Sequence, residues 1–287
     1  MVAIGADVLP VYLIHFNKPL WCASAHASVL KSRGVRLDIC VIDNGQTEGP
    51  PLSTVLSERT RILRTSENRG YTAGANMALK EWRACWPHAE FCVIGSHDLH
   101  VRPDALAKLV LSARAHPGFG IMAPVLVKPF ESSGGVWTGQ GGYQLPLADR
   151  RGLAERDWVS GTCLLLRAAC IEQVGDFDES FGSYVEDVDL CLRARDAGWK
   201  VGVVQDAVAW GLGSGSEDAP AMTEANIVRL VAKRGNVAAW ARAIVRLLTW
   251  TVRSAIGTLA VWRPRERRRA SLRFFRQHFR ALQGGRV

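Results

Sequence analysis

Three short segments of the chain contain carboxylates that could take part in chemistry. They are Asp43, Asp98, and the run that contains Glu186, Asp187 and Asp189. A carboxylate can accept hydrogen bonds from a nucleotide base or a ribose hydroxyl, hold a hard divalent cation, or act as a general base. Each segment also has a purely structural interpretation. Asp-Asn-Gly is a strong turn sequence, and acidic residues at the start of a helix complement the helix dipole.

The elements that must position these carboxylates alternate between short apolar runs and helical patterns. In chain order we predict a strand at 8–16, a helix at 19–32, a strand at 37–43, a strand at 61–63, a helix at 71–86 and a strand at 91–95. This alternation predicts an α/β fold with a Rossmann-like, mostly parallel central sheet flanked by helices. Ligands of such sheets bind at the carboxyl ends of strands, where residues 15–17, Asp43 and Asp98 are expected.

The second half of the chain continues the pattern after an interruption. Residues 131–152 contain six glycines and little periodicity, which predicts a loop. Beyond it we predict a strand at 158–167, helices at 168–174 and 186–197, and a strand at 200–204. The acidic run Glu186 to Asp189 then begins a helix.

Charge is distributed unevenly along the chain. The net charge is +9, but residues 221–287 hold 15 Lys and Arg against 2 acidic residues, so residues 1–220 are slightly acidic. A basic end on an acidic body predicts a segment that seeks anions, either phospholipid or nucleic acid.

The basic end is predicted to be helical over residues 223–260. Arg242, Arg246 and Arg253 fall on one face, and apolar residues such as Trp240 fill the remainder. This composition is typical of a helix that lies in a bilayer interface, although a helix packed on the body would have a similar pattern.

Seven cysteines form no C-x-x-C pair, so the sequence predicts neither a disulfide framework nor a zinc site. Signal-peptide features are missing, and no apolar run approaches the ~18 residues that span a bilayer. We therefore expect a cytoplasmic protein, peripheral on the inner face of the plasma membrane.

Several segments, taken together, resemble the family 2 glycosyltransferases, which are inverting enzymes with the glycosyltransferase A fold, and especially their rhamnosyltransferase-like branch. They are VIDNGQTEG (41–49) with NRGYTAGANMAL (68–79), FCVIGSHDLHVRPDALAKL (91–109), and WVSGTCLLLR (158–167) with VGDFDESFGSYVEDVDLCLRARDAGWKV (174–201). The resemblance spans about residues 8–215.

The first segments imply the donor site. In the family, the aspartate of the first motif binds the base or ribose of the donor, which gives Asp43 that role. Glycines at 70 and 74 let the backbone approach the nucleotide closely. The donor-binding residues implied are Asp43, Asn44, Asn68, Gly70, Gly74, Asn76, His97 and Asp98.

A metal site is implied at Asp98, because the family holds Mg²⁺ or Mn²⁺ with a D-x-D motif. Here the first carboxylate is replaced by Ser96, and residues 210–214 lack the metal-binding histidine usual in the family. The site therefore looks incomplete, which allows a variant that depends less on metal, with Arg69 or Lys128 as charge partners.

The last segments imply the catalytic site. In the family, the aspartate of the Glu-Asp pair deprotonates the acceptor hydroxyl, which makes Asp187 the general base and Glu186 its supporting group. The acceptor-binding residues implied are Trp158, Ser160, Gly161 and Asp189.

We therefore expect residues 1–220 to form a catalytic domain that transfers a sugar from a UDP- or dTDP-sugar to a hydroxyl acceptor, lipid-linked or close to a membrane. Residues 221–287 are expected to be a basic amphipathic extension at the membrane surface or the acceptor. The alternative is a non-catalytic member that binds nucleotide or lipid. A nucleotidyltransferase is rejected because the first strand lacks a following glycine-rich loop, and we expect no nucleic-acid partner because no binding-module motif is present.

Overall fold

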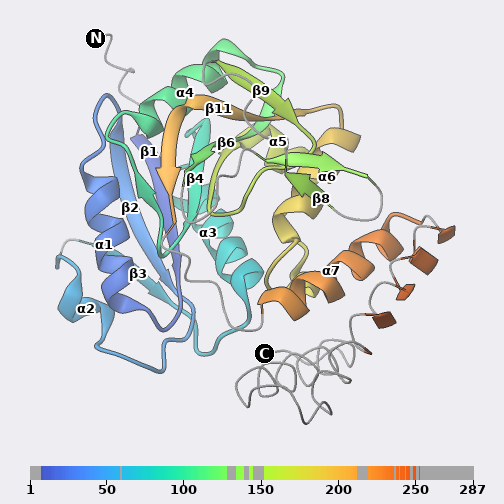
Figure 1. Cartoon of the computed structure of the whole chain (residues 1–287). Helices are drawn as coiled ribbons and strands as arrows, with labels where there is room; N and C mark the ends of the chain where they lie inside the picture. The colour runs from blue at the N-terminus through green and yellow to red at the C-terminus, as the bar shows by residue number, and fades with distance from the viewer. Residues whose placement is uncertain are drawn as a thin grey trace.

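A mixed β-sheet separates two layers of helices in the computed structural model (Figure 1). The structure describes residues 8–127, 134–138, 142–144, 152–211 and 219–252, apart from residues 59, 236, 239, 243, 246, 247, 250 and 251. Within these ranges the strand order of the large sheet is β3-β2-β1-β4-β10-β6-β11-β5, and β9 also pairs with β11.

The strands of this sheet are β1 (Val8–His15), β2 (Arg36–Asp43), β3 (Arg61–Arg64), β4 (Phe91–Ser96), β5 (His100–Val101), β6 (Phe119–Leu126), β9 (Leu153–Arg156), β10 (Cys163–Arg167) and β11 (Lys200–Trp210). Strands β1 to β4 pair in parallel, and β11 is parallel to β6. Strand β10 runs antiparallel to both of its neighbours, β4 and β6. A separate hairpin joins β7 (Gly135–Trp137) to β8 (Gly142–Gln144).

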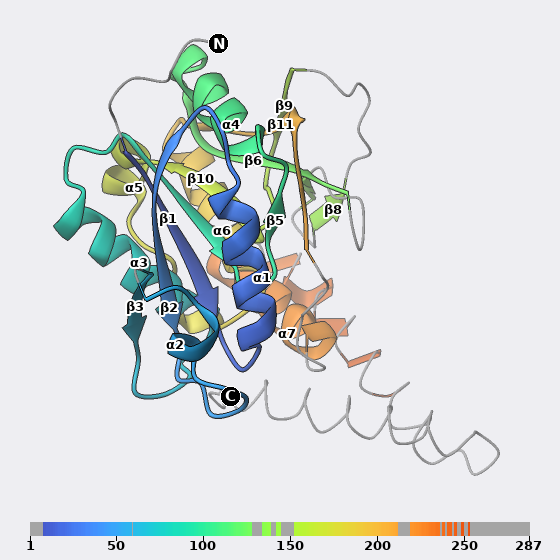
Figure 2. The same ribbon diagram turned by 90° about the vertical axis from the view of Figure 1, so that its left-hand side faces the viewer.

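Helices cover both faces of the sheet because successive strand residues point to opposite sides. Tyr12 and Ile14 of β1 belong to one buried cluster, which includes residues of α3 (Tyr71–Cys85), α5 (Ala168–Val174), α6 (Glu186–Asp196) and α7 (Ala219–Lys233). Val11 and Leu13 belong to a second cluster, which includes residues of α1 (Pro19–Leu30), α2 (Leu52–Val55) and α4 (Ala105–Ala115). Figure 2 shows α1 and α2 in front of the sheet, on the face turned toward the viewer.

The predicted α/β fold with a flanked, mostly parallel sheet is confirmed, with differences in the second half. The predicted strand at 158–167 begins only at Cys163, because residues 160–162 form a loop at the edge of the sheet. Helix α4 and strands β6 and β9 were not predicted. The predicted loop at 131–152 holds the β7–β8 hairpin, and its other residues up to 151 lie outside the described ranges.

Helix α7 opens the predicted extension and packs on the body. Ile227, Leu230 and Val231 belong to the same buried cluster as residues of α6. The described residues between 237 and 252 are helical and expose large apolar side chains, among them Trp240 and Leu248, whereas residues 253–287 lie outside the described ranges. Among the described residues, no helix is long and apolar enough to cross a bilayer.

Candidate active site

The ends of three parallel strands and the start of an antiparallel one meet at one edge of the sheet. In the sheet, His15 of β1 pairs with Asp43 of β2, and Ile14 of β1 pairs with Ser96 of β4. Strands β1, β2 and β4 therefore end beside one another. Because β10 runs the other way, its first residues begin at that edge, and the Ser96 N–H donates to the Thr162 carbonyl at 3.1 Å. The sheet topology therefore brings residues 43, 98 and 161 to one side of the fold.

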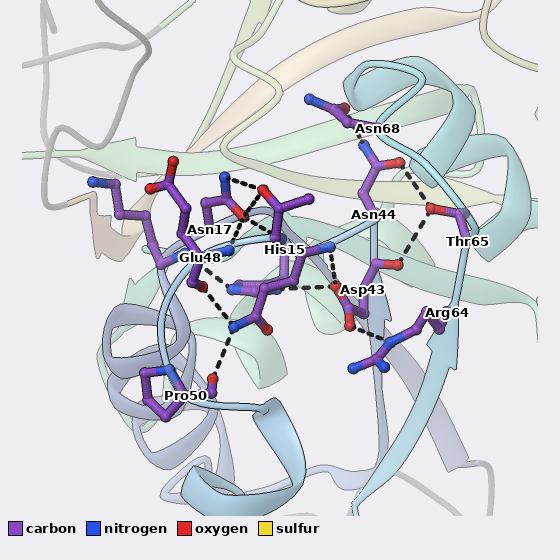
Figure 3. A network of polar contacts seen from close by, with 12 residues as sticks. His15, Asn17, Asp43, Asn44, Glu48, Pro50, Arg64, Thr65 and Asn68 are labelled. Atoms are coloured by element: carbon purple, nitrogen blue, oxygen red, sulfur yellow. Dashed lines mark hydrogen bonds and ion pairs between the residues drawn. The ribbon is translucent and has the colours of Figure 1, made fainter.

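Asp43 is fully buried, and its two oxygens have different partners (Figure 3). Oδ1 accepts a hydrogen bond from the Gln46 N–H at 3.0 Å, and Oδ2 accepts one from Arg64 Nε at 2.7 Å. The first contact is the turn hydrogen bond that Asp-Asn-Gly predicts. Each carboxylate oxygen retains a second lone pair. The side chain has no exposed surface, so a direct contact with a nucleotide requires its neighbours to move.

His15 lies beside Asp43 and was noted from the sequence only as a polar strand end. Its Nδ1 is 3.6 Å from Asp43 Oδ1, and its Nε2 accepts a hydrogen bond from the Lys18 N–H. The pKa of His15 is lowered to about 4, chiefly by burial and also by nearby His97, while Asp43 opposes the shift. His15 is therefore neutral at physiological pH.

The predicted donor residues Asn44, Asn68 and Gly70 form a small hydrogen-bonded brace. Figure 3 shows its contact between Asn44 and Asn68. Asn44 Nδ2 donates to Asn68 Oδ1 at 3.1 Å and to the Gly70 carbonyl at 2.8 Å, while the Gly70 N–H donates back to Asn68 Oδ1. The brace holds the start of α3 against the end of β2.

Both glycines of this segment are required by close packing. Gly70 has a φ of 86°, and a Cβ there would lie 2.6 Å from the Gly182 carbonyl oxygen. A Cβ on Gly74 would lie 2.8 Å from Ile14 Cγ2. Asn76 exchanges two hydrogen bonds with the backbone of Phe177, so its amide ties α3 to the loop before α6.

Asp98 is buried, and its Oδ1 accepts a hydrogen bond from Ser96 Oγ at 2.5 Å. A Cβ on Gly211 would lie 3.4 Å from Asp98 Oδ2. Residue 211 therefore lies beside the carboxylate, and as a glycine it has no side chain that could bind a metal ion. His100 Nδ1 contacts the Asp98 carbonyl, and its ring stacks on Trp210. His97 lies with its ring 5.7 Å from that of His15.

These donors do not fit a divalent cation held by the protein alone. Mg²⁺ and Mn²⁺ prefer several oxygen ligands, and Asp98 is one carboxylate. Within the part of the chain that the structure describes, no group of three or more His, Cys, Asp or Glu side chains could hold a metal. Of the two suggested charge partners, Arg69 pairs with Glu179 at 3.1 Å, and Lys128 lies outside the described residues.

Asp187 stands in the first turn of α6 and is half-buried. Its Oδ2 accepts a hydrogen bond from the Gly161 N–H at 2.6 Å, and its Oδ1 accepts one from the Val188 N–H at 2.8 Å. Burial raises the pKa of Asp187, although these two backbone donors oppose the shift. A carboxylate with a raised pKa is a better proton acceptor than a free one.

Tyr71 joins this group and was missed as a functional residue. Its hydroxyl donates to the Gly161 carbonyl at 2.9 Å, so the backbone of one residue, Gly161, contacts both Tyr71 and Asp187. Burial raises the pKa of Tyr71 well above its usual range, and the charges of Glu186 and Asp187 raise it further. The only sequence signal was its place inside the segment 68–79.

Glu186 is buried, and its Oε2 has no hydrogen-bond partner among the described residues. Burial raises the pKa of Glu186 well above its usual range, and the neighbouring charge of Asp187 adds to the effect. The two neighbouring carboxyl groups therefore resist ionising together, and the larger upward shift of pKa falls on Glu186.

The residues predicted to bind acceptor are placed unequally. Ser160 and Gly161 lie in the loop that contacts Asp187, and Ser160 Oγ is 3.2 Å from Thr162 Oγ1. Trp158 is buried, and its indole nitrogen has no partner in the described ranges. Asp189 is buried and pairs with both Arg193 and Lys233 at 2.8 Å, which gives it a structural role between α6 and α7.

Comparisons with known proteins find a matching family model and related sequences. The family model described as "Glycosyltransferase like family 2" matches residues 58–280. An N-acetylglucosaminyl-diphospho-decaprenol L-rhamnosyltransferase of Mycobacterium tuberculosis is 27% identical over 226 residues, which cover 67% of this chain and 72% of the relative.

Solved structures share the fold at low sequence identity. A mannosyltransferase of Pyrobaculum calidifontis, solved with GDP-Man and Mn²⁺, is 17% identical, with a TM-score of 0.59 over 96% of this chain and 87% of its own. GalNAc-T7, solved with UDP, GalNAc and Mn²⁺, is 13% identical, with a TM-score of 0.61 over 80% of this chain and 48% of its own.

Proposed function

The chain belongs to glycosyltransferase family 2, and on that basis we propose that it is an inverting glycosyltransferase. It transfers a sugar from a UDP- or dTDP-sugar to a hydroxyl of a lipid-linked or membrane-proximal acceptor. The observation that carries the proposal is Asp187, a carboxylate aimed by the Gly161 N–H at the edge of the sheet where Asp43 and Asp98 also lie.

In the proposed reaction Asp187 takes the proton of the acceptor hydroxyl. The hydroxyl oxygen forms a bond to the anomeric carbon of the donor, and the bond from that carbon to the diphosphate oxygen breaks. Because the acceptor attacks the face opposite the leaving nucleoside diphosphate, the anomeric configuration inverts. The raised pKa of Asp187 supports this role, since it brings the base closer to the operating pH.

Glu186 and Tyr71 are proposed to maintain the base. A neutral Glu186 avoids a second negative charge next to Asp187, and the Tyr71 hydroxyl holds the carbonyl of Gly161, the residue whose N–H points at the carboxylate. Neither residue needs to exchange a proton with the substrate in this mechanism.

The donor nucleotide is proposed to bind at Asp43. Its carboxylate is held in place by Arg64 and Gln46, and a base N–H or a ribose hydroxyl can donate to the remaining lone pairs. Asn44, Asn68 and Gly70 brace the adjoining backbone. Because the described residues do not form a metal site, no step is assigned to a metal ion.

The acceptor is proposed to lie at a membrane surface. Trp240 and Leu248 expose 44% and 56% of their surfaces on the helical segment after α7, and the same segment is rich in arginine. Such a segment suits the interface of an anionic bilayer. The decaprenol-linked acceptor in the name of the mycobacterial relative is consistent with this placement.

A transfer assay tests the proposal. The full chain is incubated with dTDP-rhamnose, UDP-glucose, UDP-galactose, UDP-N-acetylglucosamine or GDP-mannose and with N-acetylglucosaminyl-diphospho-decaprenol in anionic vesicles, and products are identified by mass spectrometry. We expect one pyrimidine donor to give a glycosylated lipid whose anomeric configuration, measured by NMR, is inverted. Retained configuration would contradict the mechanism. Nucleotide binding without transfer from any donor would favour the non-catalytic alternative.

A further inference from the structure

The turn before α6, residues 181–185, contains two consecutive residues with left-handed backbone conformations, and neither is glycine. Tyr184 has a φ of 71° and Val185 a φ of 72°. Each such residue costs about 1–3 kcal/mol, and the conformation is especially unfavourable for a β-branched side chain. This turn leads directly into Glu186 and Asp187, so contacts from elsewhere must offset its strain.

Helix α7 supplies such a contact through Asn226. The side chain is 97% buried, since only 3% of its surface is exposed. Its Nδ2 donates to the carbonyls of Phe181, Ser183 and Tyr184 at 2.8, 2.9 and 2.8 Å. A single amide group therefore ties together the backbone of the whole turn.

Arg229 fixes the direction of this amide. Its Nη1 donates to Asn226 Oδ1 at 2.6 Å, and the three carbonyls surround the other end of the amide. Only one of the two amide orientations satisfies all of these partners, because carbonyl oxygens require the NH₂ group and a guanidinium requires the oxygen.

Helix α3 holds the opposite side of the turn. The backbone N–H and the hydroxyl of Thr72 both donate to the Gly182 carbonyl at 2.9 Å, and the Tyr71 N–H donates to Ser183 Oγ at 2.9 Å. The turn thus lies between the first turn of α3 and the middle of α7, and Figure 1 shows α7 beside α6. The hydrogen bonds from α7 and those from α3 therefore both hold the turn that leads into Asp187.

We propose that Asn226 is a positioning residue for the transfer reaction, which rests on the proposed role of Asp187 as the base. Asn226 contacts no reacting atom. It holds the strained turn in the one conformation that directs Asp187 to the Gly161 N–H, so Asn226 supports the base although its sequence lies in the basic extension. Loss of the three hydrogen bonds leaves the donor site intact but misplaces the base.

The test compares Asn226→Asp and Asn226→Ala with Ile227→Val in the full chain. Asn226→Asp keeps the size of the side chain and the partner of Arg229 but presents oxygen to three carbonyls. Ile227→Val trims a buried neighbour on the same helix and leaves the amide in place. Transfer is measured with dTDP-rhamnose, or with the donor that gives turnover in the screen, and binding is measured with dTDP and UDP by calorimetry.

We expect kcat to fall by about 10²-fold in both Asn226 variants, because small displacements of a catalytic group have effects of this size. Donor KM and nucleotide affinity should stay within about twofold, and Ile227→Val should lower the melting temperature with kcat unchanged. If an Asn226 variant does not fold, Arg229→Met releases the amide from its fixed orientation and should still lower kcat several-fold at unchanged donor KM.

Two results would overturn the inference. One is wild-type kcat in a folded Asn226 variant, and the other is an equal loss of kcat in Ile227→Val, which would indicate general packing. Either can occur while Asp187→Asn is inactive, so failure of this inference is distinguishable from failure of the proposed function.

Discussion

The backbone N–H of Gly161 donates to Asp187 Oδ2 at 2.6 Å, which joins the loop before β10 to the first turn of α6. A Cβ on residue 161 would lie 3.3 Å from both Cβ and Oδ2 of Asp187, so glycine permits this approach. The direction of the carboxylate is therefore set by the main chain. Substitution of Asp187 consequently changes its chemistry more than its position.

Replacing Asp187 with asparagine should reduce turnover by about 10²–10⁴-fold, the usual contribution of a general base. The amide oxygen of asparagine can still accept the Gly161 hydrogen bond but cannot take the acceptor proton. Affinity for dTDP and UDP, measured by calorimetry, should be unchanged. Asp196→Asn, at the last residue of the same helix, serves as the control and should keep wild-type turnover. Full activity of Asp187→Asn would refute the assignment of the base.

Gly70→Ala should destabilise the protein more than Gly175→Ala. Both glycines have nearly the same backbone conformation, with φ of 86° and 79° and extended ψ, so both alanines suffer a backbone strain of about 1–3 kcal/mol. Only at residue 70 would the new Cβ also meet a backbone oxygen, that of Gly182 at 2.6 Å. Urea denaturation measures both losses. Equal losses would contradict the close contact between α3 and the turn before α6.

Ser96→Asp should create a divalent cation site that the described residues of the natural chain do not form. A second carboxylate beside Asp98 supplies the oxygen ligands that a hard cation requires, so affinity for Mn²⁺ without donor should rise on the order of tenfold or more. Calorimetric titration of Mn²⁺ measures this, with Ser53→Asp on the exposed surface of α2 as the charge control. Tight Mn²⁺ binding by the unmodified protein would contradict this prediction, because it would show that the natural chain already forms a metal site.

Stability should fall as the pH drops from 6.5 to about 4, in part because of His15. Its pKa is lowered from 6.5 to about 4 in the folded chain, so within this window the unfolded chain binds a proton that the folded chain does not. The contribution to the slope of unfolding free energy approaches about 1.4 kcal/mol per pH unit. His15→Gln should flatten the curve, measured by denaturation at a series of pH values. The exposed His88→Gln should not, and an identical slope in both variants would contradict the burial of His15.

The double variant Trp240→Ser and Leu248→Ser should weaken binding to anionic vesicles by at least about tenfold, since burying such side chains contributes about 1.5–3 kcal/mol each. Co-sedimentation with vesicles measures binding, and higher salt should weaken it further because part of the attraction is electrostatic. Leu111→Ser removes an equally exposed leucine from α4 and is the control. Unchanged binding of the double variant would remove the membrane from the proposal.

The sequence by itself determined the architecture and the groups available for chemistry. Apolar alternation placed β1, β2 and β4, and the strand ends brought Asp43 and Asp98 to one edge, because parallel strands share the side on which they end. The motif around residues 186–189 identified the carboxylates of α6 before their surroundings were known. Apolar runs suffice for the strands, since they mark the residues that a sheet buries, whereas the carboxylates of 186–189 were identified by the resemblance to a family motif.

Only the tertiary structure decided what each polar group contacts. Asp189, expected at the acceptor, is paired with Arg193 and Lys233, and Tyr71 reaches Gly161 across 90 residues of chain. Asn226 holds backbone more than 40 residues away, although nothing in its local sequence distinguishes it. Periodicity specifies a buried face but not the partner that covers it, and hydrogen bonds depend on distances of a few ångströms that only the packed loops and helices define.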